Sequence, residues 1–194
     1  LSTPLCEKNQ ITISDNSMPN AGSLVRWHWN LGDGTIVNAT NNPPITHTYV
    51  NWGNKITKLM VESSKGCLSD TLTKNVLINP LPKVGYTVPE VCLNDANAFF
   101  FDTSRIADNS ELQMTYLWSF NTGVPAIVPG PTPISSTVKN PAIKFNKADN
   151  YFLSLVVTSK DGCKDSVTAI PFTVNGSIPN ADFLLMPTNG ICSN

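Results

Sequence analysis

The sequence predicts an all-β protein built from antiparallel β-sandwiches. Nearly every ordered segment alternates apolar and polar residues, which is the two-residue period of a strand with one buried face. Ile11 and Ile13, for example, alternate with Thr12 and Ser14, and no segment shows the apolar spacing of an amphipathic helix. Clusters of turn-forming residues, such as Asn-Asn-Pro-Pro at 41–44, separate the segments at short intervals. Short strands, frequent turns and no helical pattern together favour a sandwich.

The expected strands fall into two sets of four that follow the same order. Each set begins with a short alternating strand, continues with a tryptophan-containing strand and an apolar strand, and closes with a β-branched strand. The ranges are 11–13, 24–29, 56–61 and 70–78 in the first set, and 99–101, 114–120, 151–157 and 165–174 in the second. This order predicts a repeated structural unit.

Aromatic residues support the repeat. Trp29 and Trp118 occupy matching strands, and we expect both in the core. Each precedes a second aromatic residue, and the interval from Trp29 to Tyr49 is shorter than the interval from Trp118 to Phe145. From Tyr49 and from Phe145 to the next cysteine, in contrast, the spacing is identical in the two units. A constant spacing beside a variable one is what a shared scaffold with loops of different length predicts.

Proline-marked joints divide the chain. They lie at 79–82 and 175–179, where proline cannot donate to a strand ladder and favours extended backbone before it. We therefore expect one sandwich over residues 1–80, a second over 81–176 and the start of a third repeat at 177–194. Such joints predict an end-to-end, elongated array, and the chain is interpreted as a fragment of it.

Four of the five cysteines stand at matching places in the two units, and the pattern predicts one disulfide within each: Cys6 with Cys67, and Cys92 with Cys163. Cys192 is interpreted as the first half of a further bridge. Zinc ligation is disfavoured because the chain has no Cys-x-x-Cys pair and only two histidines. Paired cysteines indicate an oxidising compartment. Closing a loop of about 60 residues would stabilise each unit by about 4 kcal/mol.

Composition narrows the function classes. Charged residues make up 14% of the chain and the net charge is −1, which argues against nucleic acid or an anionic membrane surface as partner. No apolar run is long enough to insert into a membrane. Neither His28 nor His47 stands near a serine elbow, a cysteine nucleophile or a paired acid in the sequence, so no catalytic triad can be assembled. We expect no enzymatic activity and no cofactor.

Two motifs of the first unit resemble the signature of the PKD (polycystic kidney disease) domain family. Residues 29–34, Trp-Asn-Leu-Gly-Asp-Gly, are followed by His-Thr-Tyr at 47–49, and the family has a Trp-x-Phe-Gly-Asp-Gly turn followed by a Pro-x-His-x-Tyr strand. The second unit diverges, with Trp-Ser-Phe-Asn-Thr-Gly at 118–123. The resemblance implies tandem Ig-like sandwiches.

With its doubled cysteines, the array is most similar to PKD repeats in very large surface proteins of gliding bacteria of the Bacteroidetes type, which a dedicated (type IX) secretion system exports. The resemblance implies a secreted, cell-surface module of a stalk or adhesin. Its partners would be neighbouring repeats of the same chain and surface glycans or proteins. The alternative is a carbohydrate- or protein-binding accessory of a secreted hydrolase, as in some chitinases and proteases.

Two residues are candidate ligand contacts. Asp33 lies between two glycines in a turn, where it either caps the local backbone or contributes to a calcium site. The matching run of the second unit, Asn-Thr-Gly at 121–123, has no carboxylate, which favours the turn role. Trp52 lies in a turn whose counterpart has no aromatic residue. It either stacks on a sugar ring or a partner, or folds back on its own unit.

Overall fold

The structure is a computed structural model that describes residues 4–42, 44–93, 97–120, 127, 129–176 and 181–184. Within these residues every regular element is a strand, apart from the single 3-10 turn η1 (Glu111–Gln113). The predicted all-β class is therefore confirmed. No helix in this part of the chain is long and apolar enough to cross a membrane. Most of the expected third repeat, including Cys192, lies outside the described residues.

The first unit consists of two facing sheets. A two-stranded sheet pairs β1 (Gln10–Ile13) with β4 (Ile45–Thr48), and a four-stranded antiparallel sheet has the order β3-β2-β5-β6. The strands of the larger sheet are β2 (Leu24–Asn30), β3 (Ile36–Ala39), β5 (Gly53–Ser63) and β6 (Leu72–Ile78). Alternation along β2 buries Trp27 and Trp29 on one face, as the sequence predicted.

The core of the first unit is small. Seven buried residues form it: Trp27, Trp29, Leu31, Tyr49, Leu59, Val61 and Ile78. The phenol of Tyr49 donates to the carbonyl oxygen of Leu31 at 2.9 Å, so the aromatic anchor also satisfies the backbone of the Gly-Asp-Gly turn. On the outer edge strand β6, Leu72 and Leu77 are exposed. The edge of this unit is thus more open than its centre.

The second unit has one five-stranded sheet and two small ladders. The sheet has the order β12-β11-β14-β15-β8, and the ladders pair β10 with β7 and β13 with β9. The long strands are β11 (Thr115–Phe120), β14 (Asp149–Thr158) and β15 (Lys164–Asn175). The short ones are β7 (Tyr86–Thr87), β8 (Val91–Cys92), β9 (Ala98–Phe99), β10 (Phe101–Asp102), β12 (Ser135–Ser136) and β13 (Ala142–Ile143).

The second core is larger and more aromatic than the first. Trp118 and Phe120 are fully buried and stack with their ring centroids 6.2 Å apart, and Phe100 packs against both. Phe145 and Tyr151 meet edge to face at 4.8 Å. Such aromatic pairs add about 0.5–1.5 kcal/mol each beyond the burial of their area. The expectation that Trp118 lies in the core is confirmed.

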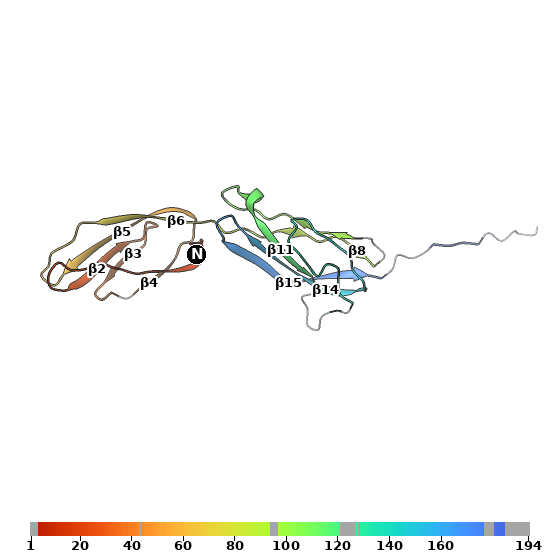
Figure 1. Cartoon of the computed structure of the whole chain (residues 1–194), viewed down its shortest axis with the longest axis horizontal. Helices are drawn as coiled ribbons and strands as arrows, with labels where there is room; N and C mark the ends of the chain where they lie inside the picture. The colour runs from red at the N-terminus through yellow and green to blue at the C-terminus, as the bar shows by residue number, and fades with distance from the viewer. Residues whose placement is uncertain are drawn as a thin grey trace, which may run out of the picture.

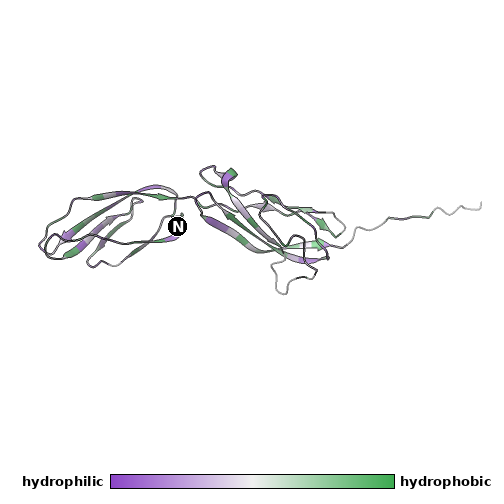
Figure 2. Cartoon of the chain, in the orientation of Figure 1, coloured by the Kyte–Doolittle hydropathy of each residue, from purple (hydrophilic) through white to green (hydrophobic). Residues whose placement is uncertain are grey.

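The two units lie one after the other along the long axis in Figure 1, and the N-terminal mark lies at the boundary between them. Hydrophobic and hydrophilic residues alternate along the strands of both units in Figure 2, in keeping with one buried and one exposed face. The buried residues form two separate clusters, one in each unit. What joins the units is therefore a local set of contacts and not a shared core.

Candidate functional site: the joint between the units

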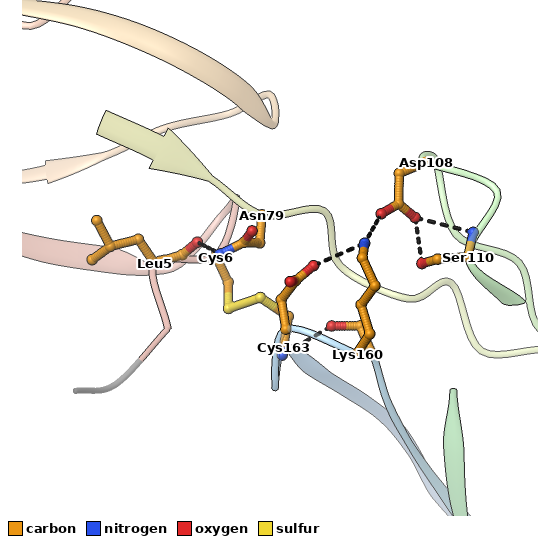
Figure 3. Close-up of polar contacts among 9 residues, drawn as sticks. Leu5, Cys6, Asn79, Asp108, Ser110, Lys160 and Cys163 are labelled. Atoms are coloured by element: carbon orange, nitrogen blue, oxygen red, sulfur yellow. Dashed lines mark hydrogen bonds and ion pairs between the residues drawn. A yellow bond between two sulfur atoms is a disulfide. The ribbon is translucent and has the colours of Figure 1, made fainter. Parts of the chain in front are cut away.

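A disulfide crosses the joint. Cys6 of the first unit is bonded to Cys163 of the second, with the Cα atoms 5.8 Å apart (Figure 3). Both cysteines are almost completely buried. The predicted pairs Cys6–Cys67 and Cys92–Cys163 are therefore wrong.

Strand register gives the physical reason for the correction. Cys6 forms a parallel bridge with Asn79, at the joint end of the first unit, whereas Cys67 follows β5 at the opposite end. Gly53 is level with Ile78, and β5 runs ten further residues to Ser63, so the two cysteines lie about 30 Å apart at about 3.3 Å per residue. A disulfide needs Cα atoms within about 7 Å.

The second unit repeats this separation. Cys92 pairs in parallel with Asn175, at the end of β15, while Cys163 directly precedes the first residue of that strand. Twelve residues of extended strand separate the two levels, again more than about 30 Å. The sequence held a signal for this: in each unit the closing strand lies between the second cysteine and the joint, so the two cysteines of one unit belong to opposite ends.

Glu7 fixes the first unit's side of the joint. Its side chain is 9% exposed, and its two carboxylate oxygens accept from the backbone amides of Trp52 and Leu81, each at 3.1 Å. Its own amide donates to the carbonyl oxygen of Asn79 at 2.9 Å. One buried carboxylate thus ties the first strand to a turn and to the linker, next to the disulfide.

A lysine organises the second unit's side. Lys160 contacts the carboxylates of Asp108 and Asp161, and Asp108 also accepts from the hydroxyl of Ser110 at 2.6 Å (Figure 3). Burial disfavours the charged form of Asp108, but hydrogen bonds from Lys160 and Ser110 outweigh it and lower the pKa of this carboxyl. The same contacts raise the pKa of the Lys160 ammonium. Both groups are therefore charged at neutral pH, and they hold two loops beside Cys163.

The linker adds backbone pairing. Lys83 and Arg105 exchange two backbone hydrogen bonds, at 2.7 and 3.0 Å, so the strand leaving the first unit runs antiparallel to a loop of the second. Pro4 also approaches Gly162, whose Cβ position would lie 3.4 Å from the proline ring. A disulfide, the Glu7 carboxylate and backbone pairing therefore act together at one joint, which could not be predicted from the sequence.

Asp33 has both carboxylate oxygens engaged. One accepts from the amide of Thr35 at 3.0 Å, and the other lies 2.7 Å from Nε2 of His47. Burial opposes ionisation, but these hydrogen bonds prevail and lower the pKa of Asp33. Neighbouring Gly32 has a positive φ, and a Cβ there would lie 2.6 Å from the backbone of Ile56. No group of three or more possible metal-ligating side chains occurs in the described part of the chain, and the geometry here suits a turn.

Trp52 lies at the joint end of the first unit, in the turn before β5. Its side chain is 42% exposed, while its backbone is held by Glu7 and by the ammonium of Lys55, which donates to the carbonyl oxygen of Trp52 at 3.4 Å. The indole is thus neither packed in the core nor fully exposed. A role in ligand contact stays a prediction.

The first unit also has a cleft of about 440 Å³ on its open side. It lies between β1 and the edge strand β6, and Trp29, Tyr49 and Leu59 form its floor. Asp15 and Lys74 lie at its polar margin. The carboxylate of Asp15 is already engaged within the unit, since it accepts a hydrogen bond from Nε1 of Trp27 at 2.6 Å.

Comparisons with known proteins bear on the first unit. A family model described as PKD domain matches residues 2–78. The match covers the stretch that forms the first β-sandwich and supports its similarity to PKD-type, Ig-like domains. A comparison with the curated proteins finds no significant match.

Several solved structures are loosely similar to the whole chain. Fibronectin(III)-like modules of Clostridium thermocellum CbhA share 17% identity, with 94% of each chain covered and a TM-score of 0.39. A structure from work on carbohydrate-binding modules of the β-sandwich superfamily shares 15%, covering 84% of this chain and 90% of that one at a TM-score of 0.36. The amphioxus IgVJ-C2 molecule shares 9%, covering 89% and 99% at 0.34. Because TM-scores of this size are low, the description of the first unit as an Ig-like sandwich rests on the family match and on the strand topology.

Proposed function

We propose that the chain is a non-catalytic spacer of a secreted surface protein, in which tandem PKD-type sandwiches are stapled end to end into an elongated stalk. The observation that carries the proposal is the Cys6–Cys163 disulfide, because it joins two units that have separate cores. A disulfide inside a unit would stabilise that unit alone. One between units fixes their spacing and resists their separation.

The surrounding contacts support a stiff joint. The buried carboxylate of Glu7 holds the linker at Leu81, and the linker pairs with the second unit at Arg105. Within the second unit, Lys160 holds two loops together beside the disulfide. A flexible linker would instead be rich in glycine and serine and free of such contacts. These contacts favour a stiff, elongated arrangement of the two units over two units connected by a flexible linker.

The extracellular placement rests on the disulfide and on the family resemblance. Disulfides persist in oxidising compartments and are rare in the cytosol. Within that placement we propose the stalk or adhesin of a large bacterial surface protein, of the kind used in gliding, with neighbouring repeats as its constant partners. The first unit's match to a PKD domain supports this class of module.

Alignment in solution tests the proposal. Residual dipolar couplings of the oxidised chain should fit one alignment tensor for both units, because a stiff joint makes them orient together. The double variant Cys6→Ala/Cys163→Ala should need two different tensors, while the matched control Cys67→Ala should behave like the parent chain. Two unrelated tensors in the oxidised parent chain would refute the stalk.

The second candidate function is a glycan- or protein-binding accessory of a secreted hydrolase. The exposed face of Trp52 and the 440 Å³ cleft of the first unit are the observations that favour it. Binding to a glycan array that is lost in Trp52→Ala, but kept in Ile36→Ala at another exposed apolar residue of the same unit, would support this function. Equal signals from both variants and the parent chain would exclude Trp52 as the contact.

A further inference from the structure

The turn that carries Cys67 has the same geometry as the turn that carries Cys163. The amide of Ser63 donates to the carbonyl oxygen of Cys67 at 2.9 Å, and that of Ser159 to Cys163 at 2.8 Å. The serine hydroxyls accept in return from the cysteine amides, at 3.2 and 3.1 Å. Hence the two cysteines leave their sheets in the same way.

The glycines before the cysteines also match. Gly66 has φ +77° and Gly162 has φ +87°, which are left-handed conformations that other residues rarely adopt. Beside Gly162 lies Pro4 of the preceding unit, whereas no described atom lies within 4 Å of the Cβ position of Gly66. Cys163 is buried by the joint and Cys67 is exposed, without a disulfide to any described residue. The same turn therefore serves an interface in one unit and faces solvent in the other.

The other end of each unit repeats as well. The amide of the residue after the first cysteine donates to the carbonyl oxygen of an asparagine where the closing strand ends. Glu7 donates to Asn79, which follows β6, at 2.9 Å, and Leu93 donates to Asn175, the last residue of β15, at 3.1 Å. In each unit the first cysteine thus lies at the end that the chain leaves, and the second cysteine at the end that the chain enters. The observed disulfide joins the leaving end of one unit to the entering end of the next.

From this we infer that Cys67 is the acceptor of a second inter-unit disulfide, made with the first cysteine, equivalent to Cys6, of another sandwich unit that precedes residues 4–80. The inference rests on the proposed stalk and specifies its partner. In its support, the equivalent cysteine of the second unit forms that bond in this molecule. The bond forms from two thiols; a small-molecule disulfide such as oxidised glutathione accepts the two electrons and two protons and becomes two thiols.

A groove of about 300 Å³ beside Cys67 fits the same partner. Met18, Leu24 and Leu68 line it, and the first and last of these are 88% and 57% exposed. Exposed apolar side chains that gather around a groove mark interaction surfaces. An incoming unit bonded to Cys67 would cover this groove.

The second unit shows which part of the partner lies there. An Asp-x-Ser turn follows β1 at 15–17, and another begins at the end of β10 at 102–104; in both, the serine amide donates to the aspartate, at 2.9 and 3.0 Å. A further Asp-x-Ser turn of the second unit, at 108–110, lies later in the chain, directly before η1. The residue after the turn at 15–17 is Met18, and the residue after the turn at 102–104 is Arg105. Arg105 pairs with Lys83, in the linker that enters its unit. By the same register, a linker entering the first unit would run along Met18 and fill the groove.

A duplicated chain tests the inference. Cys92 follows Cys6 by as many positions as the segment 1–86 contains, so a copy of residues 1–86 placed directly before Leu1 keeps the spacing between units. The added copy carries Cys67→Ala, so that it brings one new cysteine, and Ser2→Ala, which marks its cysteine peptide by mass. After folding in a glutathione buffer, free thiols are alkylated and disulfide-linked tryptic peptides are identified. The matched control has Cys6→Ala in the added copy.

Two disulfides are read from the same digest. The inference expects Cys67 linked to the marked peptide and Cys6 of the original unit linked to Cys163, with Cys67 alkylated in the control. Alkylated Cys67 in the test chain, or a Cys67–Cys67 dimer, overturns the inference. If the Cys6–Cys163 bond is intact in the same digest, the joint has folded and the proposed stalk is not refuted. Absence of the Cys6–Cys163 bond in both chains refutes the stalk itself.

Discussion

Pulling the chain by its ends should reveal how much of it the inter-unit disulfide shields from force. Tension that enters before Cys6 passes through the sulfur–sulfur bond to Cys163 and leaves along β15. The residues between the two cysteines are outside this path, although they include all of the first unit. Unfolding that unit therefore cannot lengthen the oxidised chain.

The hidden length follows from the sequence separation of 157 residues. At no more than about 3.6 Å per residue, the loop stores about 57 nm of contour length. Single-molecule force spectroscopy with handles on the two termini should show this extra extension only after a reductant is added. Cys6→Ala should extend to full length without reductant, and Cys67→Ala should behave like the parent chain.

The assay also separates the observed pairing from the one that the sequence suggested. Bonds within the units, Cys6–Cys67 and Cys92–Cys163, would hide two loops of about 22 and about 26 nm, released as two independent steps. A total gain of about 57 nm that follows one reduction event supports the inter-unit bond, whether the two units then unfold together or one after the other. Two separate reduction events that release about 22 and about 26 nm, or full extension before reduction, would contradict it.

Three further predictions concern the stability of the first unit, measured by chemical denaturation. Gly32→Ala should cost about 3 kcal/mol because the new Cβ meets backbone, whereas Gly34→Ala, also at positive φ but in open space, should cost about 1 kcal/mol; equal losses would contradict the close approach. The Asp33–His47 pair should show a coupling of about 1 kcal/mol at pH 7 in a double-mutant cycle. Because the folded-state pKa of Asp33 is lowered, this stabilisation is complete above about pH 4 and is lost as the pH falls through the folded pKa; coupling that persists at pH 2 would count against it. Glu7→Ala should cost about 1–3 kcal/mol by leaving two amides unpaired, and Glu7→Gln less, since it keeps an acceptor; the reverse order would rule out this role.

The long strands were predictable because their chemistry is local. Alternation around Trp29 and around Trp118 identifies β2 and β11, since one buried face produces a two-residue period. The two-residue strands β7 to β10 could not be predicted as separate elements, because the two-residue period of a strand cannot be recognised in so few residues. The Asp33 turn was also predictable, but its contact with His47 was not, since that depends on how two sheets face each other.

The joint could not be predicted from cysteine spacing because the number of residues between two cysteines does not give the distance between them in the folded structure. The equal intervals from Tyr49 to Cys67 and from Phe145 to Cys163 suggested a bond inside each unit. The residues in those intervals instead run the length of the sandwich, along β5 in the first unit and along β14 in the second. The buried position of Glu7 could not be predicted from the sequence, since a single carboxylate is usually exposed to solvent. Its role follows from the linker that folds over it.

The constant spacing acquires a different explanation once the bond is placed between units. Tyr49 and Phe145 are buried anchors, and the segment of equal length after each anchor carries the second cysteine to the far end of its unit. One residue more would move that cysteine by about 3.3 Å and turn it to the other face of the sheet, too far for a bond that tolerates little error in geometry. The loops between tryptophan and anchor do not lie on this path, which is why their lengths can differ. In this explanation the spacing is set by where the neighbouring unit presents its cysteine. The interval before Cys163, which forms its bond to Cys6, is the same as the interval before Cys67.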